Sequence, residues 1–300
     1  MREKKTAKEW FTEAYHYDTV EAMPDKAIMA YKQSIRLDST MTDAYVNLGF
    51  LHLNRDEYDE ALTCFTHAVE LEKSNPDAYN NLGYVYERME RFGSAKQIYE
   101  KAHKLNPSNV EALINLAHIA DLQADYEGAL AYYKKAISTD QGAVAPHFLL
   151  ALLYDRHDMF DEAIAEYRLV IEKDPNHGKA ILNLGNLYAQ QGDHAQAIEC
   201  FRRLLELDTC TAEAHNNLGS IYEEMGHYQE ALAAYRKSLA VNNLQEDAHL
   251  NLARLEYTRH SGRLDGPRRE EISKRLHFVL SLNPHNRKAQ RLLDTIEGRT

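Results

Sequence analysis

Residues 76–109 read PDAYNNLGYVYERMERFGSAKQIYEKAHKLNPSN, and this pattern returns along most of the chain. The pair Leu82-Gly83 recurs as Leu-Gly or Leu-Ala in seven copies, at steps of 34 residues without slippage. An alanine at the place of Ala95 and a phenylalanine or tyrosine at the place of Tyr99 keep the same period. Three series in phase exceed what chance produces, so the chain is a tandem repeat.

Each copy has the composition and periodicity of helices. Leu, Ala, Glu and Lys dominate, and 13 Gly and 7 Pro leave little room for long loops. With Pro76 as position 1 of its copy, positions 4, 7, 8 and 11 are mostly apolar or small. That spacing indicates the core stripe of a first helix, and the alanine and aromatic series then lie on a second helix.

The period and the pattern L-G-x-x-Y…A-x-x-x-F/Y resemble tetratricopeptide repeats. The first tyrosine of the pattern is present as Tyr86, Tyr154, Tyr188 and Tyr222, whereas His52 and Ala120 depart from it. The resemblance implies an all-α fold, a right-handed superhelical α-solenoid of helix-turn-helix repeats. It also implies that positions 2, 6, 9 and 13 line a concave inner surface.

We expect a single solenoid over residues 1–300. Its parts are a divergent first repeat (8–41), six regular 34-residue repeats (42–245), a seventh repeat (246–286) with an inserted loop (261–267), and a C-terminal capping helix (287–297).

Position 6 carries an asparagine in six of the seven phased copies: Asn47, Asn81, Asn115, Asn183, Asn217 and Asn251. Because an asparagine amide offers both donors and an acceptor, this series predicts contact with the backbone of an extended peptide. It is similar to the asparagine ladder in the repeat region of O-GlcNAc transferases, although no transferase domain follows here. The alternative is that these amides bond only to water or to a neighbouring helix.

The inner stripe also carries acidic and apolar residues. Asp77 and Glu111 occupy position 2, where acids either face a ligand or stabilise the first turn of a helix. Acids at position 12, such as Glu87 and Glu223, extend the predicted acidic wall, and this wall argues against binding of acidic chaperone tails. Phe148 and Leu149 replace polar residues of other copies and predict either an apolar pocket or tighter helix packing.

The charge is uneven. The net charge is −11, yet the last fifty residues hold eleven Lys and Arg against six Asp and Glu. A basic cluster there predicts a patch for an acidic partner or for a second copy of the chain, or else a solvated end. Its members are Arg254, Arg259, Arg263, Arg268, Arg269, Lys274 and Arg275.

Several function classes are disfavoured. No Gly-rich phosphate loop, nucleophile elbow or HExxH motif occurs, so we expect no enzyme, cofactor or metal site. The negative charge argues against nucleic acid. Neither a signal peptide nor a membrane-spanning run is evident, and three scattered cysteines do not form a disulfide framework. We therefore expect a cytoplasmic protein without membrane insertion.

The pattern favours a protein-interaction scaffold or adaptor that binds an extended peptide or a helix of another protein in its concave groove. Two alternatives stay open: a self-assembling structural scaffold, and a regulatory subunit of an enzyme system whose catalysis lies on another chain.

Overall fold

A computed structural model describes residues 5–260 and 264–298, and every regular element in those residues is an α-helix. The helices are α1 (Ala7–Thr19), α2 (Pro24–Leu37), α3 (Thr42–Leu53), α4 (Tyr58–Leu71), α5 (Pro76–Arg88), α6 (Phe92–Leu105), α7 (Val110–Leu122), α8 (Tyr126–Thr139), α9 (Val144–Arg156), α10 (Phe160–Lys173), α11 (Gly178–Gln190), α12 (His194–Glu206), α13 (Thr211–Glu224), α14 (Tyr228–Val241), α15 (Glu246–Arg259), α16 (Gly266–Leu282) and α17 (Arg287–Glu297).

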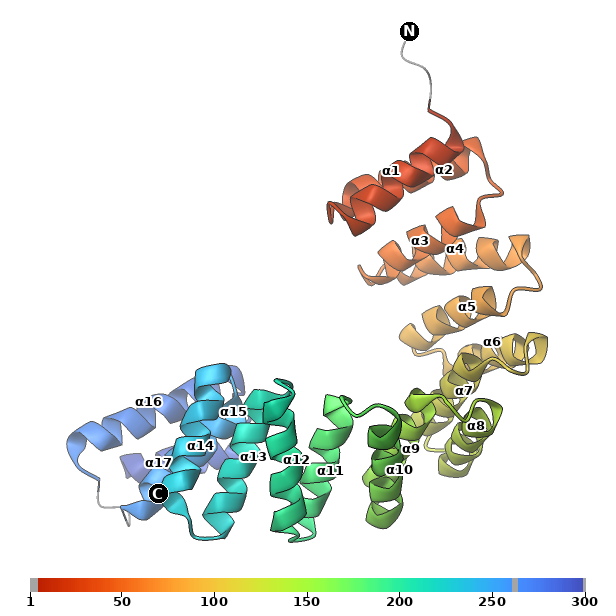
Figure 1. Ribbon diagram of the computed structural model, residues 1–300. Helices are drawn as coiled ribbons and strands as arrows, with labels where there is room; N and C mark the ends of the chain where they lie inside the picture. Colours follow the sequence, from red (N-terminus) through yellow and green to blue (C-terminus); the bar gives the residue numbers. More distant parts are fainter. Residues whose placement is uncertain (1–4, 261–263, 299–300) are drawn as a thin grey trace. The chain divides into compact units, whose positions relative to one another are not determined.

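Consecutive helices form antiparallel hairpins that stack on their neighbours (Figure 1). Contacts divide the chain into unit 1, residues 1–150, and unit 2, residues 151–300, with the division inside α9. Within unit 1 the first helices α3, α5 and α7 touch in succession, as α11, α13 and α15 do within unit 2. The expected all-α solenoid is therefore confirmed.

The turn between the two helices of a repeat has the same backbone geometry in six copies. One residue there takes a left-handed conformation, which ends the first helix and reverses the chain. Its φ lies at 57–58° in Asp56, Glu90, Ala124 and Asp158, and at 78° in Gly192 and Gly226. Because only two of the six are glycine, residue type alone does not reveal this turn.

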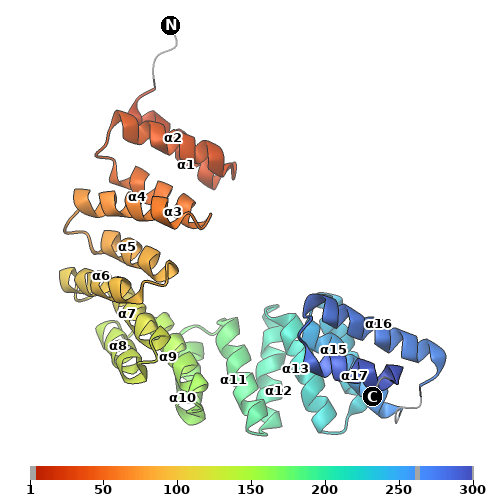
Figure 2. The ribbon, with the colours of Figure 1, turned by 180° about the vertical axis from the view of Figure 1, so that it is seen from behind.

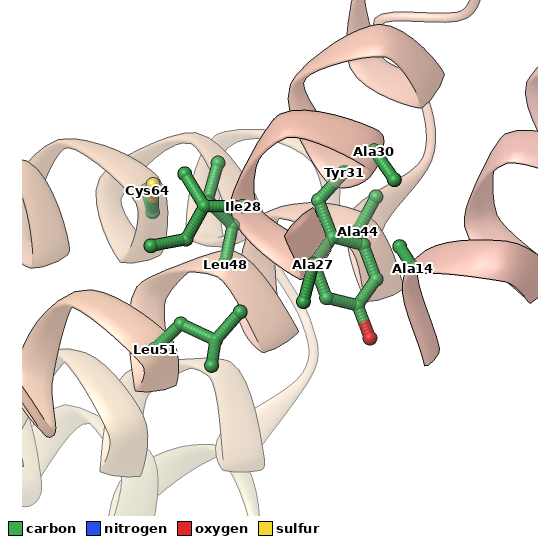
Figure 3. Close-up of a cluster of buried hydrophobic side chains, with 9 residues drawn as sticks. All are labelled: Ala14, Ala27, Ile28, Ala30, Tyr31, Ala44, Leu48, Leu51 and Cys64. Atoms are coloured by element: carbon green, nitrogen blue, oxygen red, sulfur yellow. The ribbon is translucent and has the colours of Figure 1, made fainter. Parts of the chain in front are cut away.

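The core consists of small residues that let helices approach and aromatic rings that fill the space. In unit 1, one cluster joins α1 to α4 (Figure 3), and it contains Ala14, Ala27, Ile28, Ala30, Tyr31, Ala44, Leu48, Leu51 and Cys64. Further along, Gly83 packs on the ring of Tyr99 so closely that an added Cβ would lie 2.5 Å from it. The glycine at position 8 thus sets the distance between the two helices of its repeat.

The C-terminal end of unit 2 closes with a three-helix cluster (Figure 2). It joins Leu250 and Ala253 of α15 and three residues of α16 to Ala289, Leu293 and Ile296 of α17. The helix expected as a polar cap therefore packs as the first helix of a further repeat, with one apolar side buried.

Candidate functional site

The first helices of unit 1 present one continuous set of equivalent positions, which we name the unit 1 face. It comprises positions 2, 6 and 9 of α3, α5 and α7: Asp43, Asn47, Phe50, Asp77, Asn81, Tyr84, Glu111, Asn115 and His118. The three acids are exposed and the three asparagines are half-buried. Because α5 contacts both α3 and α7, and the axes of packed helices lie about 8–10 Å apart, equivalent positions of the three helices are neighbours.

Two asparagines of the position 6 series hydrogen-bond to a tyrosine of the preceding helix. The Asn47 side chain donates to the Tyr31 hydroxyl at 3.1 Å, and the Asn183 side chain donates to the Tyr167 hydroxyl at 3.1 Å. In both pairs the tyrosine lies sixteen residues earlier and is buried. These two amides therefore satisfy core hydroxyls and are held in one orientation.

Asn81 and Asn115 make no hydrogen bond through their side chains in the described part of the chain. Sixteen residues before Asn81 stands Phe65, which has no hydroxyl. Sixteen residues before Asn115 stands Tyr99, whose hydroxyl instead donates to Glu87 at 2.9 Å. These amides keep their full hydrogen-bonding capacity on adjacent helices.

Two later members of the series, on α13 and α15, bond to other amides. Asn217 donates to Asn186 at 2.7 Å, and Asn251 donates to Asn216 at 3.1 Å. Asn216, which is buried, in turn donates to Asn217 at 3.1 Å. Four amides thus link α11, α13 and α15, so Asn217 and Asn251 are bonded differently from Asn47 and Asn183.

The acids at position 12 accept hydrogen bonds from core tyrosines. The Tyr99 hydroxyl donates to Glu87 and the Tyr235 hydroxyl donates to Glu223, both at 2.9 Å. Burial raises the pKa of both tyrosines, and the neighbouring carboxylate raises it further, so each hydroxyl stays protonated and donates. Where the aromatic residue is Phe65 or Phe201, position 12 holds Leu53 or Ala189.

Sequence reasoning interpreted these carboxylates as part of an acidic wall. The side chains of Glu87 and Glu223 are only 13% and 16% exposed, so they contribute little to the surface. Asp77 and Glu111 at position 2 are exposed, as a ligand contact requires.

Two aromatic residues of the unit 1 face were missed by the sequence analysis. Phe50 and Tyr84 at position 9 are each 39% exposed. The Phe50 ring meets the buried Phe65 ring edge-on at 5.1 Å, which fixes its orientation. The sequence did offer a signal for these two residues. The resemblance to tetratricopeptide repeats already placed position 9 on the inner stripe, and an aromatic residue there could have been noted.

The apolar pair for which the sequence left open a pocket or tighter helix packing lies on α9. Phe148 and Leu149 are both half-buried, so each still exposes part of an apolar side chain. They stay candidate contacts at the end of unit 1.

Most of the predicted basic cluster has carboxylate neighbours. Arg254 pairs with both oxygens of Glu223 at 2.6 and 2.8 Å, and Lys274 pairs with Glu270 at 2.6 Å. Three other members also have neighbours: Arg275 lies 3.3 Å from Glu271, Arg268 lies 3.6 Å from Asp265, and Arg259 stacks over Tyr228. Arg269 is exposed, and Arg263 lies outside the described residues.

In residues 5–260 and 264–298, no group of three His, Cys, Asp or Glu side chains has the arrangement of a metal site. None of the described helices is long and apolar enough to cross a membrane.

Solved structures with the same arrangement of helices are numerous. Human IFIT1, solved as a dimer with m7Gppp-AAAA, has a TM-score of 0.63 and 17% identity over 98% of this chain and 72% of that chain. A chain of the APC/C hetero-tetramer Cut9-Hcn1 has a TM-score of 0.60 and 18% identity over 96% of this chain, which spans 55% of that chain. A tetratricopeptide repeat protein from Parabacteroides merdae has a TM-score of 0.59 and 19% identity over 83% of this chain and 98% of that chain. Such identities show the fold alone.

Sequence comparison identifies the family. No curated protein matches the chain in sequence. A tetratricopeptide repeat profile matches residues 40–108, 76–142 and 178–243, and a second profile of the same description matches residues 147–177. These matches cover more than half of the chain, which therefore belongs to the tetratricopeptide repeat family.

Proposed function

We propose that this chain is a protein-interaction scaffold that binds an extended segment of a partner protein on the unit 1 face. The observation that carries the proposal is the pair of unoccupied amides, Asn81 and Asn115, on the adjacent helices α5 and α7. An amide side chain presents a donor and an acceptor side by side, which matches the backbone of an extended peptide. A helix has no free backbone groups along its middle, so an extended segment fits better than a helix.

The surroundings of the two amides suggest the partner's side chains. Exposed carboxylates at position 2, such as Asp77 and Glu111, lie on one side of the asparagine row, and the aromatic side chains of Phe50 and Tyr84 lie on the other. Side chains of an extended segment alternate between opposite sides. A segment with basic residues on one side and apolar residues on the other would complement this face.

The experiment compares two double variants of the full chain. Peptides that bind wild type are first selected from a random displayed library, and their affinities for each variant are then measured by fluorescence anisotropy. Asn81→Ala with Asn115→Ala removes about four hydrogen bonds of about 0.5 kcal/mol each, so affinity should fall about thirtyfold.

The control is Asn47→Ala with Asn183→Ala, which removes amides already bonded to tyrosines. Its peptide affinity should stay within about twofold of the wild-type value. Its free energy of unfolding should fall, because two buried tyrosine hydroxyls lose a hydrogen-bond partner. Equal affinity of the selected peptides for both double variants would show that the position 6 series does not contact peptide.

A further inference from the structure

The C-terminal helix α17 lies where a further first helix would lie, and its two sides differ sharply. Ala289, Leu293 and Ile296 are buried against α15 and α16. The chain before it is fixed because the side chains of Asn283 and Asn286 both donate to Glu246 of α15, at 3.0 and 2.5 Å. Next to this buried side, Arg287, Lys288 and Arg291 of α17 border a hollow that α15 also lines.

Between α15 and α17 the surface is hollowed to a volume of about 1010 Å³. Four cations line it: Arg254 from α15, and Arg287, Lys288 and Arg291 from α17. Asp247 is the one carboxylate of the lining, and Leu250 and Leu292 provide apolar surface. The hollow is therefore basic, on a chain whose net charge is −11.

The cations of α17 differ from those of α16. Lys274 and Arg275 on α16 pair with carboxylates one turn earlier on the same helix. Arg287, Lys288 and Arg291 have no ion pair with any described residue. Three cations without an ion pair thus lie together in the hollow, whereas four members of the cluster predicted from the sequence are paired with carboxylates.

We propose that the hollow between α15 and α17 binds an acidic segment of a partner protein, with carboxylates facing Lys288 and Arg291 and an apolar side chain on Leu250 and Leu292. Charge complementarity carries this assignment, because the three cations of α17 without an ion pair outnumber the one carboxylate of the lining, and this balance favours an anionic ligand and its rate of association. A polypeptide fits better than a nucleic acid, since the lining offers two leucine side chains and holds no Trp, Tyr or Phe, and its one ring is the imidazole of His285. This surface belongs to unit 2 and does not depend on the proposed role of the unit 1 face.

The test uses the full chain and a short labelled peptide of alternating Glu and Ser residues with one central Leu. Its isosteric Gln counterpart and a single-stranded RNA of equal charge serve as comparison probes, and binding is followed by fluorescence anisotropy at about 50 mM and about 300 mM salt. Lys288→Glu with Arg291→Glu is the test variant. Arg269→Glu with Lys274→Glu is its matched control, because it makes the same charge change on α16.

Wild type should bind the Glu peptide, lose most of that binding at the higher salt, and bind the Gln peptide at least about tenfold more weakly. The test variant should lose about tenfold in affinity, while the control stays within about twofold. Circular dichroism of both variants checks that the helices are retained.

Three results would overturn the proposal: no binding of the Glu peptide to wild type, equal losses in the test and control variants, or tighter binding of the RNA with the same dependence on Lys288 and Arg291. The last result would assign the hollow to nucleic acid instead.

Discussion

Removal of the Glu223 carboxylate should destabilise the middle of unit 2, and Tyr235→Phe added to it should cost almost nothing more. This carboxylate accepts from the Tyr235 hydroxyl at 2.9 Å and from Arg254 at 2.6 and 2.8 Å. Tyr235 is fully buried, and the Arg254 side chain is 48% exposed. The two interactions therefore have different costs when they are lost.

Glu223→Ala leaves the Tyr235 hydroxyl with Ser220, 3.3 Å away, as its remaining partner, so this loss costs about 1 kcal/mol. The half-exposed ion pair with Arg254 contributes at most about 1 kcal/mol, because solvent screens it. The single variant should thus cost about 2 kcal/mol. Tyr235→Phe alone should cost about 1 kcal/mol.

The double variant should cost about 2 kcal/mol, not the sum of about 3 kcal/mol, because both substitutions remove the same hydrogen bond. The chain already contains this combination, since Phe65 occurs with Leu53 and Phe201 with Ala189. Hydrogen exchange of α13, α14 and α15 measures the local free energy of opening, which suits a repeat array better than one global transition. If the cost of the double variant equals the sum of the two single costs within about 0.3 kcal/mol, the two substitutions do not remove the same hydrogen bond.

Two further substitutions test packing and turn geometry. Leu184→Ala removes a side chain that is only 6% exposed, so it should cost about 2–5 kcal/mol, with faster hydrogen exchange in α11 and its neighbours and little change in distant repeats. Ala124→Gly should stabilise the chain by about 0.5 kcal/mol in urea unfolding, because Ala124 has a φ of 58° where Gly192 and Gly226 occupy the equivalent turns; a loss of stability would contradict the strain at Ala124.

The helices and their order could be predicted from the sequence because their signals repeat at a fixed period. One weak stripe of apolar residues is ambiguous, but seven copies in phase are not. The same periodicity hides what differs between copies. Asn47 and Asn81 look equivalent in sequence, yet only Asn47 has a tyrosine hydroxyl within reach, at 3.1 Å.

The basic end shows a second limit of sequence reasoning. The count of charged residues in the sequence located the positive end of the chain. It did not show which of these cations form an ion pair with a carboxylate. Lys274 and Arg275 have an acid four residues earlier, and helix geometry brings those pairs together. For Lys288 and Arg291 the deciding fact is the hollow against α15, which depends on tertiary packing.

The difference between the two kinds of asparagine leads to a last prediction, which needs no change to any asparagine. Phe65→Tyr would place a hydroxyl where Tyr31 and Tyr167 have theirs, and both of those accept from the asparagine sixteen residues later. Because position 12 of that repeat is Leu53, no carboxylate competes, so the new hydroxyl should engage Asn81. Peptides selected on wild type should then bind about fivefold more weakly, since one of two free amides becomes occupied at a cost of about 1 kcal/mol. Phe201→Tyr is the matched control: it makes the same change beside Asn217 in unit 2 and should leave peptide affinity unchanged. If the side-chain amide resonance of Asn81 shifts as expected for a new hydrogen bond while affinity stays at the wild-type value, the free amide of Asn81 is not what holds the peptide.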